Sequence, residues 1–159
     1  MPVPRRNAAP NSVTAADLVW CGAAKPPWRH NWAKRNRLRA EPPFGIHDAS
    51  ETAIAWHLVG VVGGKRATQV WDVIRPALRQ LLLRTDDVWV VVATSGPRHA
   101  VAEGPADAAV AGAALGVACW LLPVEPTITR AKERYGEVLS GHTVTGGGVA
   151  HIRDRAARP

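Results

Sequence analysis

A chain that alternates continuous apolar runs with a small-residue helix has few folds open to it. Residues 88–93 read V-W-V-V-V-A, residues 105–116 are rich in alanine and glycine, and residues 117–122 read V-A-C-W-L-L. Runs that are apolar on both faces are typical of parallel sheets, which bind ligands where strands end and helices begin. The eleven-residue loop at 94–104 lies at such a junction. The sequence therefore predicts a binding site in this loop.

The same alternation extends on both sides of this segment. Residues 67–83 carry apolar side chains at the i, i+3, i+4 spacing of a helix packed on a sheet, and Pro76 predicts a kink or a new helix start within it. The other expected elements are strands at 57–62 and 142–145 and helices from 105 and at 127–139. This order predicts an α/β layered fold with a mostly parallel sheet and right-handed crossovers.

The basic charge of the chain is concentrated in its first 40 residues. They hold eight lysines and arginines and one acid, Asp17, whereas residues 41–159 hold twelve basic and twelve acidic residues. The net charge of +7 therefore belongs to this leader. Because consecutive prolines at 42 and 43 stop a helix, we expect three parts: a basic, partly irregular N-terminal leader at 1–43, a folded domain at 44–152 and a charged C-terminal tail at 153–159.

Two tryptophans lie among the basic residues of the leader. Trp28 and Trp32 are four residues apart, so one helical turn would present both rings on the same face. Rings of this kind can stack on bases while nearby cations neutralise phosphates. The alternative is that the rings pack on the core and the cations are solvated. The candidate contacts to DNA or RNA are Trp28, Arg29, Trp32, Lys34, Arg35 and Arg37.

Cysteine usage and hydropathy indicate the compartment. Cys21 and Cys119 provide neither a disulfide framework nor metal-ligand spacing. The basic N-terminal residues lead into no apolar signal segment, and no apolar run approaches the roughly 20 residues of a membrane span. We therefore expect a soluble, cytoplasmic protein without a metal, a cofactor or a membrane partner. Homo-oligomer formation is left open.

A glycine turn, Gly63-Gly64-Lys65-Arg66, follows the strand expected at 57–62. Glycines let the backbone approach an anion, the next helix supplies N–H donors, and the two cations add charge. The turn matches neither a Walker A loop nor the G-x-G-x-x-G fingerprint. It predicts a phosphate contact, with a tight turn that merely uses glycine as the alternative.

Several of these segments together carry a family resemblance. They are L-V-G-V-V-G-G-K-R at 58–66, V-W-V-V-V-A-T-S-G at 88–96, A-E-G-P-A-D-A-A-V-A-G-A-A-L-G-V at 102–117 and R-A-K-E-R-Y at 130–135. They resemble the SLOG superfamily, the Rossmann-like group that includes DNA-processing protein A and the Lonely-guy nucleotide hydrolases. The resemblance implies a Rossmann-like three-layer domain that binds a nucleotide or nucleotide-derived ligand, as a sensor or a nucleotide-processing protein. It assigns ligand contacts to Gly63, Gly64, Lys65, Arg66, Ser95, Gly96, Gly104 and Asp107.

The sequence departs from this family in two places. The second glycine turn is usually compact, whereas residues 97–103 are inserted between Gly96 and Gly104. The hydrolase members carry P-G-G-x-G-T-x-x-E near the last strand, and this chain has T-G-G-G-V-A-H-I at 145–152 without that threonine and glutamate. The resemblance therefore favours binding or sensing over N-glycosidic hydrolysis.

A metal-dependent nuclease is the remote alternative. The run W-D-V-I-R-P-A-L-R-Q-L-L-L-R-T-D-D-V-W at 71–89 faintly resembles the RusA-type Holliday-junction resolvases, in which clustered aspartates hold Mg²⁺ for phosphodiester cleavage. That resemblance would make Asp72, Asp86 and Asp87 the metal ligands. A solvated turn is the simpler explanation of Asp86 and Asp87.

Overall fold

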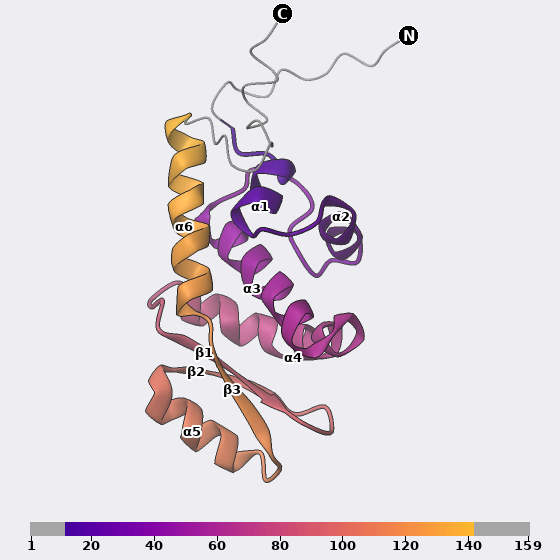
Figure 1. Cartoon of the computed structure of the whole chain (residues 1–159), viewed down its shortest axis with the longest axis vertical. Helices are drawn as coiled ribbons and strands as arrows, with labels where there is room; N and C mark the ends of the chain where they lie inside the picture. Colours follow the sequence, from indigo (N-terminus) through magenta and orange to yellow (C-terminus); the bar gives the residue numbers. More distant parts are fainter. Residues whose placement is uncertain (1–11, 142–159) are drawn as a thin grey trace, which may run out of the picture.

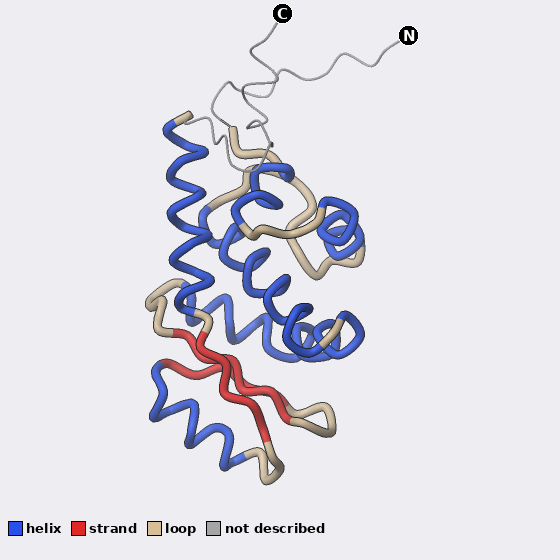
Figure 2. Tube along the Cα trace, in the orientation of Figure 1, coloured by secondary structure: helices blue, strands red, loops and turns tan. Residues whose placement is uncertain are grey.

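The computed structural model describes residues 12–141, which form six helices around a sheet of three strands (Figure 1). The elements in chain order are α1 (Ala15–Cys21), α2 (Pro26–Lys34), α3 (Ile46–Val62), α4 (Gly64–Leu82), β1 (Val88–Ala93), β2 (His99–Glu103), α5 (Gly104–Ala114), β3 (Cys119–Pro123) and α6 (Glu125–Ser140). Figure 2 shows the sheet with α5 on one side and the remaining helices on the other. No helix in this part of the chain has the length and apolar character needed to cross a membrane.

The sheet is antiparallel throughout, with the strand order β2–β1–β3. The mostly parallel, Rossmann-like sheet predicted from the sequence is therefore wrong. The prediction failed because residues 99–103, in the second half of the expected long loop, form the strand β2. This strand pairs with β1 after a five-residue hairpin loop at 94–98. The chain has thus reversed its direction before α5 begins, and β3 runs antiparallel to β1 as well. The parallel pair joined by α5 is β2 and β3, which flank β1.

The strand expected at 57–62 is also wrong, because these residues form the last turns of α3. Asp48 stabilises the start of this helix by accepting a hydrogen bond from the backbone N–H of Gly45 (2.7 Å). The first half of α3 is buried nearly all round, from Asp48 to Ala55. Because the helix is covered on several sides, its apolar residues follow no single stripe, and a short apolar run cannot separate a buried helix from a strand.

The other expected elements within the described residues have the predicted type. The helix expected at 67–83 is α4, which continues through Pro76, and the strand expected at 88–93 is β1. The segments expected from 105, at 117–122 and at 127–139 correspond to α5, β3 and α6. The strand expected at 142–145 and the tail at 153–159 lie outside the described residues.

Both faces of β1 are buried, which explains its continuous apolar sequence. Val88, Val90 and Val92 belong to the core formed with α3 and α4, whereas Val91 packs with Ala108 of α5 on the opposite face. A Cβ atom at Gly112 would lie 2.8 Å from Sγ of Cys119. Glycine at this position therefore lets α5 lie close to β3.

Four tryptophan rings connect the predicted leader to the core. The ring centroids of Trp28 lie 4.9 Å from those of both Trp32 and Trp56, and Trp32 lies 5.9 Å from Trp71. Trp71 is fully buried, and its Nε1–H donates to the carbonyl oxygen of Arg37 (2.8 Å). Helix α2 thus shares one hydrophobic core with α3, α4 and the sheet.

Candidate functional site

One end of the sheet brings the glycine turn next to the β1–β2 hairpin loop. Arg66, in the first turn of α4, donates from Nη2 to the carbonyl oxygens of Ala93 (2.7 Å) and Gly96 (2.9 Å). These bonds fasten the start of α4 to the end of β1. We call the region formed by residues 63–66 and 95–99 the basic strand end. It contains six of the predicted ligand residues: Gly63, Gly64, Lys65, Arg66, Ser95 and Gly96.

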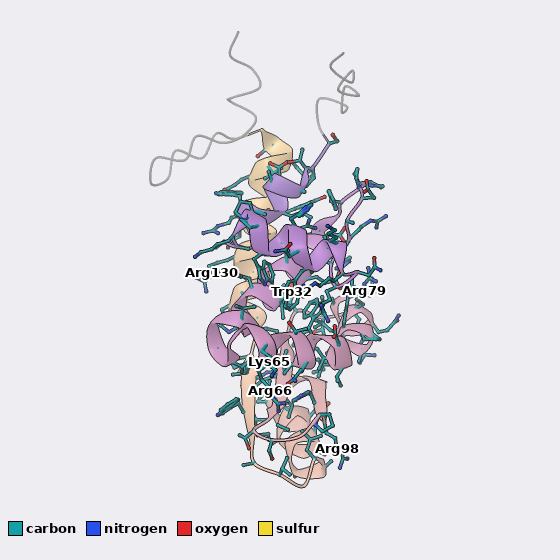
Figure 3. The ribbon with its side chains drawn as sticks, turned by 90° about the vertical axis from the view of Figure 1, so that its right-hand side faces the viewer. Trp32, Lys65, Arg66, Arg79, Arg98 and Arg130 are labelled. Carbon is teal, nitrogen blue, oxygen red and sulfur yellow. The ribbon has the colours of Figure 1, made fainter. Side chains whose placement is uncertain are left out.

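The first turn of α4 has the properties of an anion-binding helix terminus. Gly63 precedes the helix with φ of 83°, no side chain caps its free N–H groups, and no acid lies in its first turn. Unpaired N–H groups and the positive end of the helix dipole both attract negative charge. Lys65 and Arg98 are exposed, and neither belongs to an ion pair within residues 12–141. Figure 3 shows Lys65, Arg66 and Arg98 on the same side of the molecule.

His99 adds a buried polar group to this region. Its Nδ1 accepts a hydrogen bond from the backbone N–H of Ala93 (3.2 Å), whereas its buried Nε2 has no partner among the described residues. Burial, and then the charge of Arg66, lower the pKa of His99. The neutral ring therefore carries its proton on Nε2, because Nδ1 is the acceptor. A buried N–H without an acceptor is costly in free energy, and a ligand oxygen could accept from it.

Trp120 gives this end of the sheet an exposed aromatic ring. His99 and Trp120 both pair with Val92, so all three side chains lie on the same face of the sheet. His99 and Trp120 are thus two strand spacings apart, about 10 Å. Trp120 is 48 % exposed. The sequence predicted Trp120 within a strand, but only the antiparallel register places it on the same face of the sheet as His99.

Two of the predicted ligand residues lie at the opposite end of the sheet. Gly104 follows β2 and donates its N–H to the carbonyl oxygen of Asp87 (2.9 Å), just before β1 begins. Asp107 follows in the first turn of α5 and lines a cavity of about 620 Å³ with Arg84 and Glu103. The antiparallel course of β2 separates these residues from Gly96 by the length of a strand. Gly104 and Asp107 therefore do not join the basic strand end.

The predicted nucleic-acid contacts divide into buried and exposed residues. Trp32 and Arg29 are 7 % and 3 % exposed, and Arg29 donates to the carbonyl oxygen of Arg39 (2.9 Å). Trp28 is half-buried between Trp32 and Trp56. Lys34 and Arg35 are exposed at the end of α2. The sixth residue, Arg37, is held by a bidentate ion pair with Asp72 (2.8 and 2.9 Å), which raises the pKa of Arg37.

The three aspartates of the nuclease hypothesis are dispersed. Asp72 lies in the middle of α4 beside Arg37, whereas Asp86 precedes β1 and pairs with Lys132 (2.6 Å). Asp87 accepts a hydrogen bond from Nε1 of Trp89 (3.2 Å). No group of three or more histidine, cysteine, aspartate or glutamate side chains within residues 12–141 is arranged to hold a metal ion.

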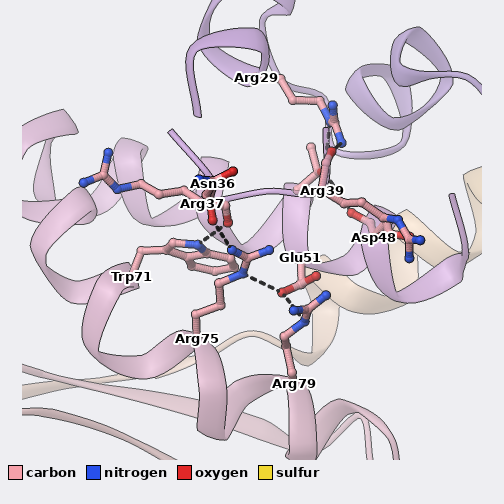
Figure 4. Close-up of polar contacts among 10 residues, drawn as sticks. Arg29, Asn36, Arg37, Arg39, Asp48, Glu51, Trp71, Arg75 and Arg79 are labelled. Carbon is pink, nitrogen blue, oxygen red and sulfur yellow. Dashed lines mark hydrogen bonds and ion pairs between the residues drawn. The ribbon is translucent and has the colours of Figure 1, made fainter. Parts of the chain in front are cut away.

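A buried ionic cluster joins α3 to α4 away from the basic strand end (Figure 4). Glu51 is 2 % exposed, and its Oε1 lies 3.3 Å from Nε of both Arg75 and Arg79. Burial raises the pKa of Glu51, and the charges of Arg79 and Arg75 oppose that rise. Arg75 also donates to the carbonyl oxygen of Asn36, which connects the cluster to the segment after α2. The cluster thus connects α3, α4 and the segment after α2, and its charged side chains already pair with one another.

Comparisons of the chain with protein-family models, with curated protein sequences and with solved structures return no match.

Proposed function

We propose that this protein binds the phosphate group of a nucleotide or nucleotide-derived ligand at the basic strand end. The observation that carries the proposal is the pair of hydrogen bonds from Arg66 to Ala93 and Gly96, which position the first turn of α4 against the hairpin loop. Lys65 and Arg98 supply charge and form no ion pair with a carboxylate of residues 12–141, and the α4 N–H groups supply donors. Trp120 offers a ring on which a base can stack, about 10 Å from His99.

The double variant Lys65→Ala/Arg98→Ala tests the phosphate contact. We expect it to weaken binding of nucleoside mono- and diphosphates by about 100-fold or more, because hydrogen bonds to charged groups contribute roughly 1.5–3 kcal/mol each and the variant removes two such groups. Isothermal titration calorimetry of the full chain measures the affinity. Arg84→Ala is the matched control, since Arg84 is an exposed arginine at the other end of β2. Equal affinities of the double variant and the control would contradict the proposal.

Nucleic-acid binding is a second candidate, and it rests on the position of Lys34 and Arg35. The Arg37–Asp72 ion pair attaches the end of α2 to α4, where Asp72 lies two turns after Lys65. A phosphate chain that contacts Lys65 could therefore continue toward Lys34 and Arg35.

The variant Lys34→Ala/Arg35→Ala tests this second candidate with a single-stranded oligonucleotide. Because each neutralised phosphate of a single strand contributes about 0.7 to the slope of log K against log salt, the slope should fall by about 1.4. Fluorescence anisotropy over a series of salt concentrations measures it. An unchanged slope and affinity would remove this candidate.

Residence in the cytoplasm belongs to the same proposal. Cys21 lies in α1 and Cys119 in β3, and both are free thiols. Burial raises the pKa of Cys21 to about 12, so its thiol is protonated and unreactive at neutral pH. Unpaired thiols are typical of proteins in a reducing compartment.

A further inference from the structure

A small cavity lies where α1, α3 and α6 meet, and its lining shares no residue with the basic strand end. Its volume is about 180 Å³, and its polar lining consists of Cys21, His57, Thr127, Arg130 and Arg134 beside the ring of Trp56. The remaining lining residues are glycine and alanine. We call this cavity the α1–α3–α6 pocket. Among residues 12–141, its lining contains cations and neutral groups but no carboxylate.

The two arginines of the pocket have no carboxylate partner in the described part of the chain. Neither Arg130 nor Arg134 belongs to any of the ion pairs formed there. They are four residues apart on α6, so they share one helix face. Arg134 is held in place by a hydrogen bond to the carbonyl oxygen of Trp20 (3.1 Å) and by the face of the Trp20 ring, 5.5 Å from its guanidinium carbon. A fixed guanidinium is an effective partner for an oxyanion because little side-chain entropy remains to be lost.

The other polar groups of the pocket do not neutralise these charges. Burial keeps the Cys21 thiol protonated, and burial together with the charge of Arg130 lowers the pKa of His57. His57 is therefore a neutral ring that can donate one hydrogen bond. The acids that raise the pKa of Cys21 are Asp17 and Glu137, and neither lines the cavity. Asp17 takes part in the capping box at the start of α1. Its carboxylate accepts a hydrogen bond from the backbone N–H of Thr14, and its own backbone N–H donates to the Thr14 hydroxyl.

The size of the cavity restricts the ligand. Sites for drug-sized molecules typically measure about 300–1,000 Å³, and 180 Å³ lies below that range. At about 30 Å³ for each water molecule, the cavity has room for a single tetrahedral oxyanion and its immediate hydration. A nucleotide base and ribose do not fit inside it.

The geometry points to a second binding site, in which the α1–α3–α6 pocket holds one phosphate group through Arg130, Arg134 and His57. The ligand is inorganic phosphate or the terminal phosphate of a small phosphomonoester whose remainder extends into solvent. In this site, Arg134 is held in a fixed position and binds the anion. Arg130 lies one turn earlier on α6 and contacts the same anion. Figure 3 places Arg130 at the edge of the molecule away from Arg79, so the pocket is separate from the buried Glu51 cluster. This inference does not depend on nucleotide binding at the basic strand end.

Phosphate titration of the full chain tests the pocket, with the imidazole signals of His57 and the indole signal of Trp56 followed by NMR at constant ionic strength. We expect saturable shifts of both signals in the wild type. Arg130→Gln should require at least tenfold more phosphate, as expected from loss of a hydrogen bond between charged groups. Arg84→Gln, a matched exposed arginine, should titrate like the wild type. Lys65→Ala should also leave these local signals unchanged, which separates this site from the basic strand end.

Glycerol 3-phosphate in place of inorganic phosphate distinguishes the two sources of the ligand. Tighter binding of the ester identifies a phosphomonoester, and tighter binding of the free anion identifies inorganic phosphate. The inference is overturned if neither compound shifts His57 and Trp56, or if Arg130→Gln responds like the wild type. Equal shifts with added sodium chloride would overturn it too, because they would reflect ionic strength alone.

Discussion

Trp71→Ala should lower the free energy of unfolding by about 4 kcal/mol, within the range of roughly 3–5 kcal/mol for truncating a buried tryptophan. Trp71 is fully buried at the point where α4 meets α2, and its ring lies 5.9 Å from that of Trp32. The substitution removes the packing of the ring and leaves the carbonyl oxygen of Arg37 without its indole donor. Urea denaturation of the full chain, followed by circular dichroism, measures the change.

Two further variants separate the causes of this loss. Trp71→Phe retains most of the apolar surface and loses the hydrogen bond to Arg37, so it should cost about 1–2 kcal/mol. Trp120→Ala removes an indole that is 48 % exposed, so it should lower stability by only about 1–2 kcal/mol. Equal losses for Trp71→Ala and Trp120→Ala would contradict the prediction that the buried contacts of Trp71 contribute more to stability than the half-exposed ring of Trp120.

The same tryptophans show what the sequence could and could not predict. The i, i+4 spacing of Trp28 and Trp32 predicted two rings on one helix face, and α2 contains both. Whether such a face binds bases or the protein's own core depends on distant partners, here Trp56 and Trp71. Periodicity describes one element at a time, so it identified the face without identifying its partner.

The sheet gives a second example of this limit. The apolar sequence of β1 correctly predicted a strand buried on both faces. The parallel direction predicted from the same pattern was wrong, because helices covering both faces of an antiparallel sheet bury a central strand as completely as a parallel sheet does. The residues H-A-V-A-E of β2 have only a weak strand pattern, and pairing with β1 determines their conformation. That single missed strand also explains why Gly104 and Asp107 lie at the opposite end of the sheet from Gly96.

The candidate sites were predictable to different degrees. Lys65, Arg66 and the loop residues Ser95 and Gly96 were identified individually, and the hydrogen bonds of Arg66 explain why they lie together. The shared helix face of Arg130 and Arg134 could also be predicted from the sequence, because the two arginines are four residues apart. The position of His57 opposite them could not be predicted, because residues 57–62 were interpreted as a strand and not as the end of α3.

Removing one arginine from the buried ionic cluster should make stability depend on pH. Arg75→Met leaves Glu51 paired with Arg79 alone. Because the Arg79 side chain is 51 % exposed, solvent weakens its attraction to the buried carboxylate. The pKa of Glu51, already raised by burial, should rise further. At pH 7 we expect a loss of about 2 kcal/mol, below the roughly 3–5 kcal/mol of a buried pair that is broken completely, because Arg79 remains.

The sign of the pH dependence follows from this raised pKa. Below the ordinary value of 4.5, Glu51 is neutral in both the folded and the unfolded chain, so the missing Arg75 charge costs little. As the pH rises above 4.5, the unfolded chain releases its proton first, and stability falls until the pH exceeds the raised pKa of the folded variant. Urea denaturation at pH 4 and pH 7 should therefore show a small and a large difference from the wild type.

The Glu51→Gln background assigns this effect to one carboxylate. Glutamine keeps the size of the side chain and cannot ionise. In that background, Arg75→Met should therefore lower stability by the same amount at every pH, through lost packing and the lost hydrogen bond to the carbonyl oxygen of Asn36. Arg79→Met in the wild-type background is the matched comparison, and its effect should be smaller because that arginine is half exposed. A loss for Arg75→Met that is equal at both pH values would mean that its contribution comes from the Asn36 contact and packing, with no buried charge left uncompensated at Glu51.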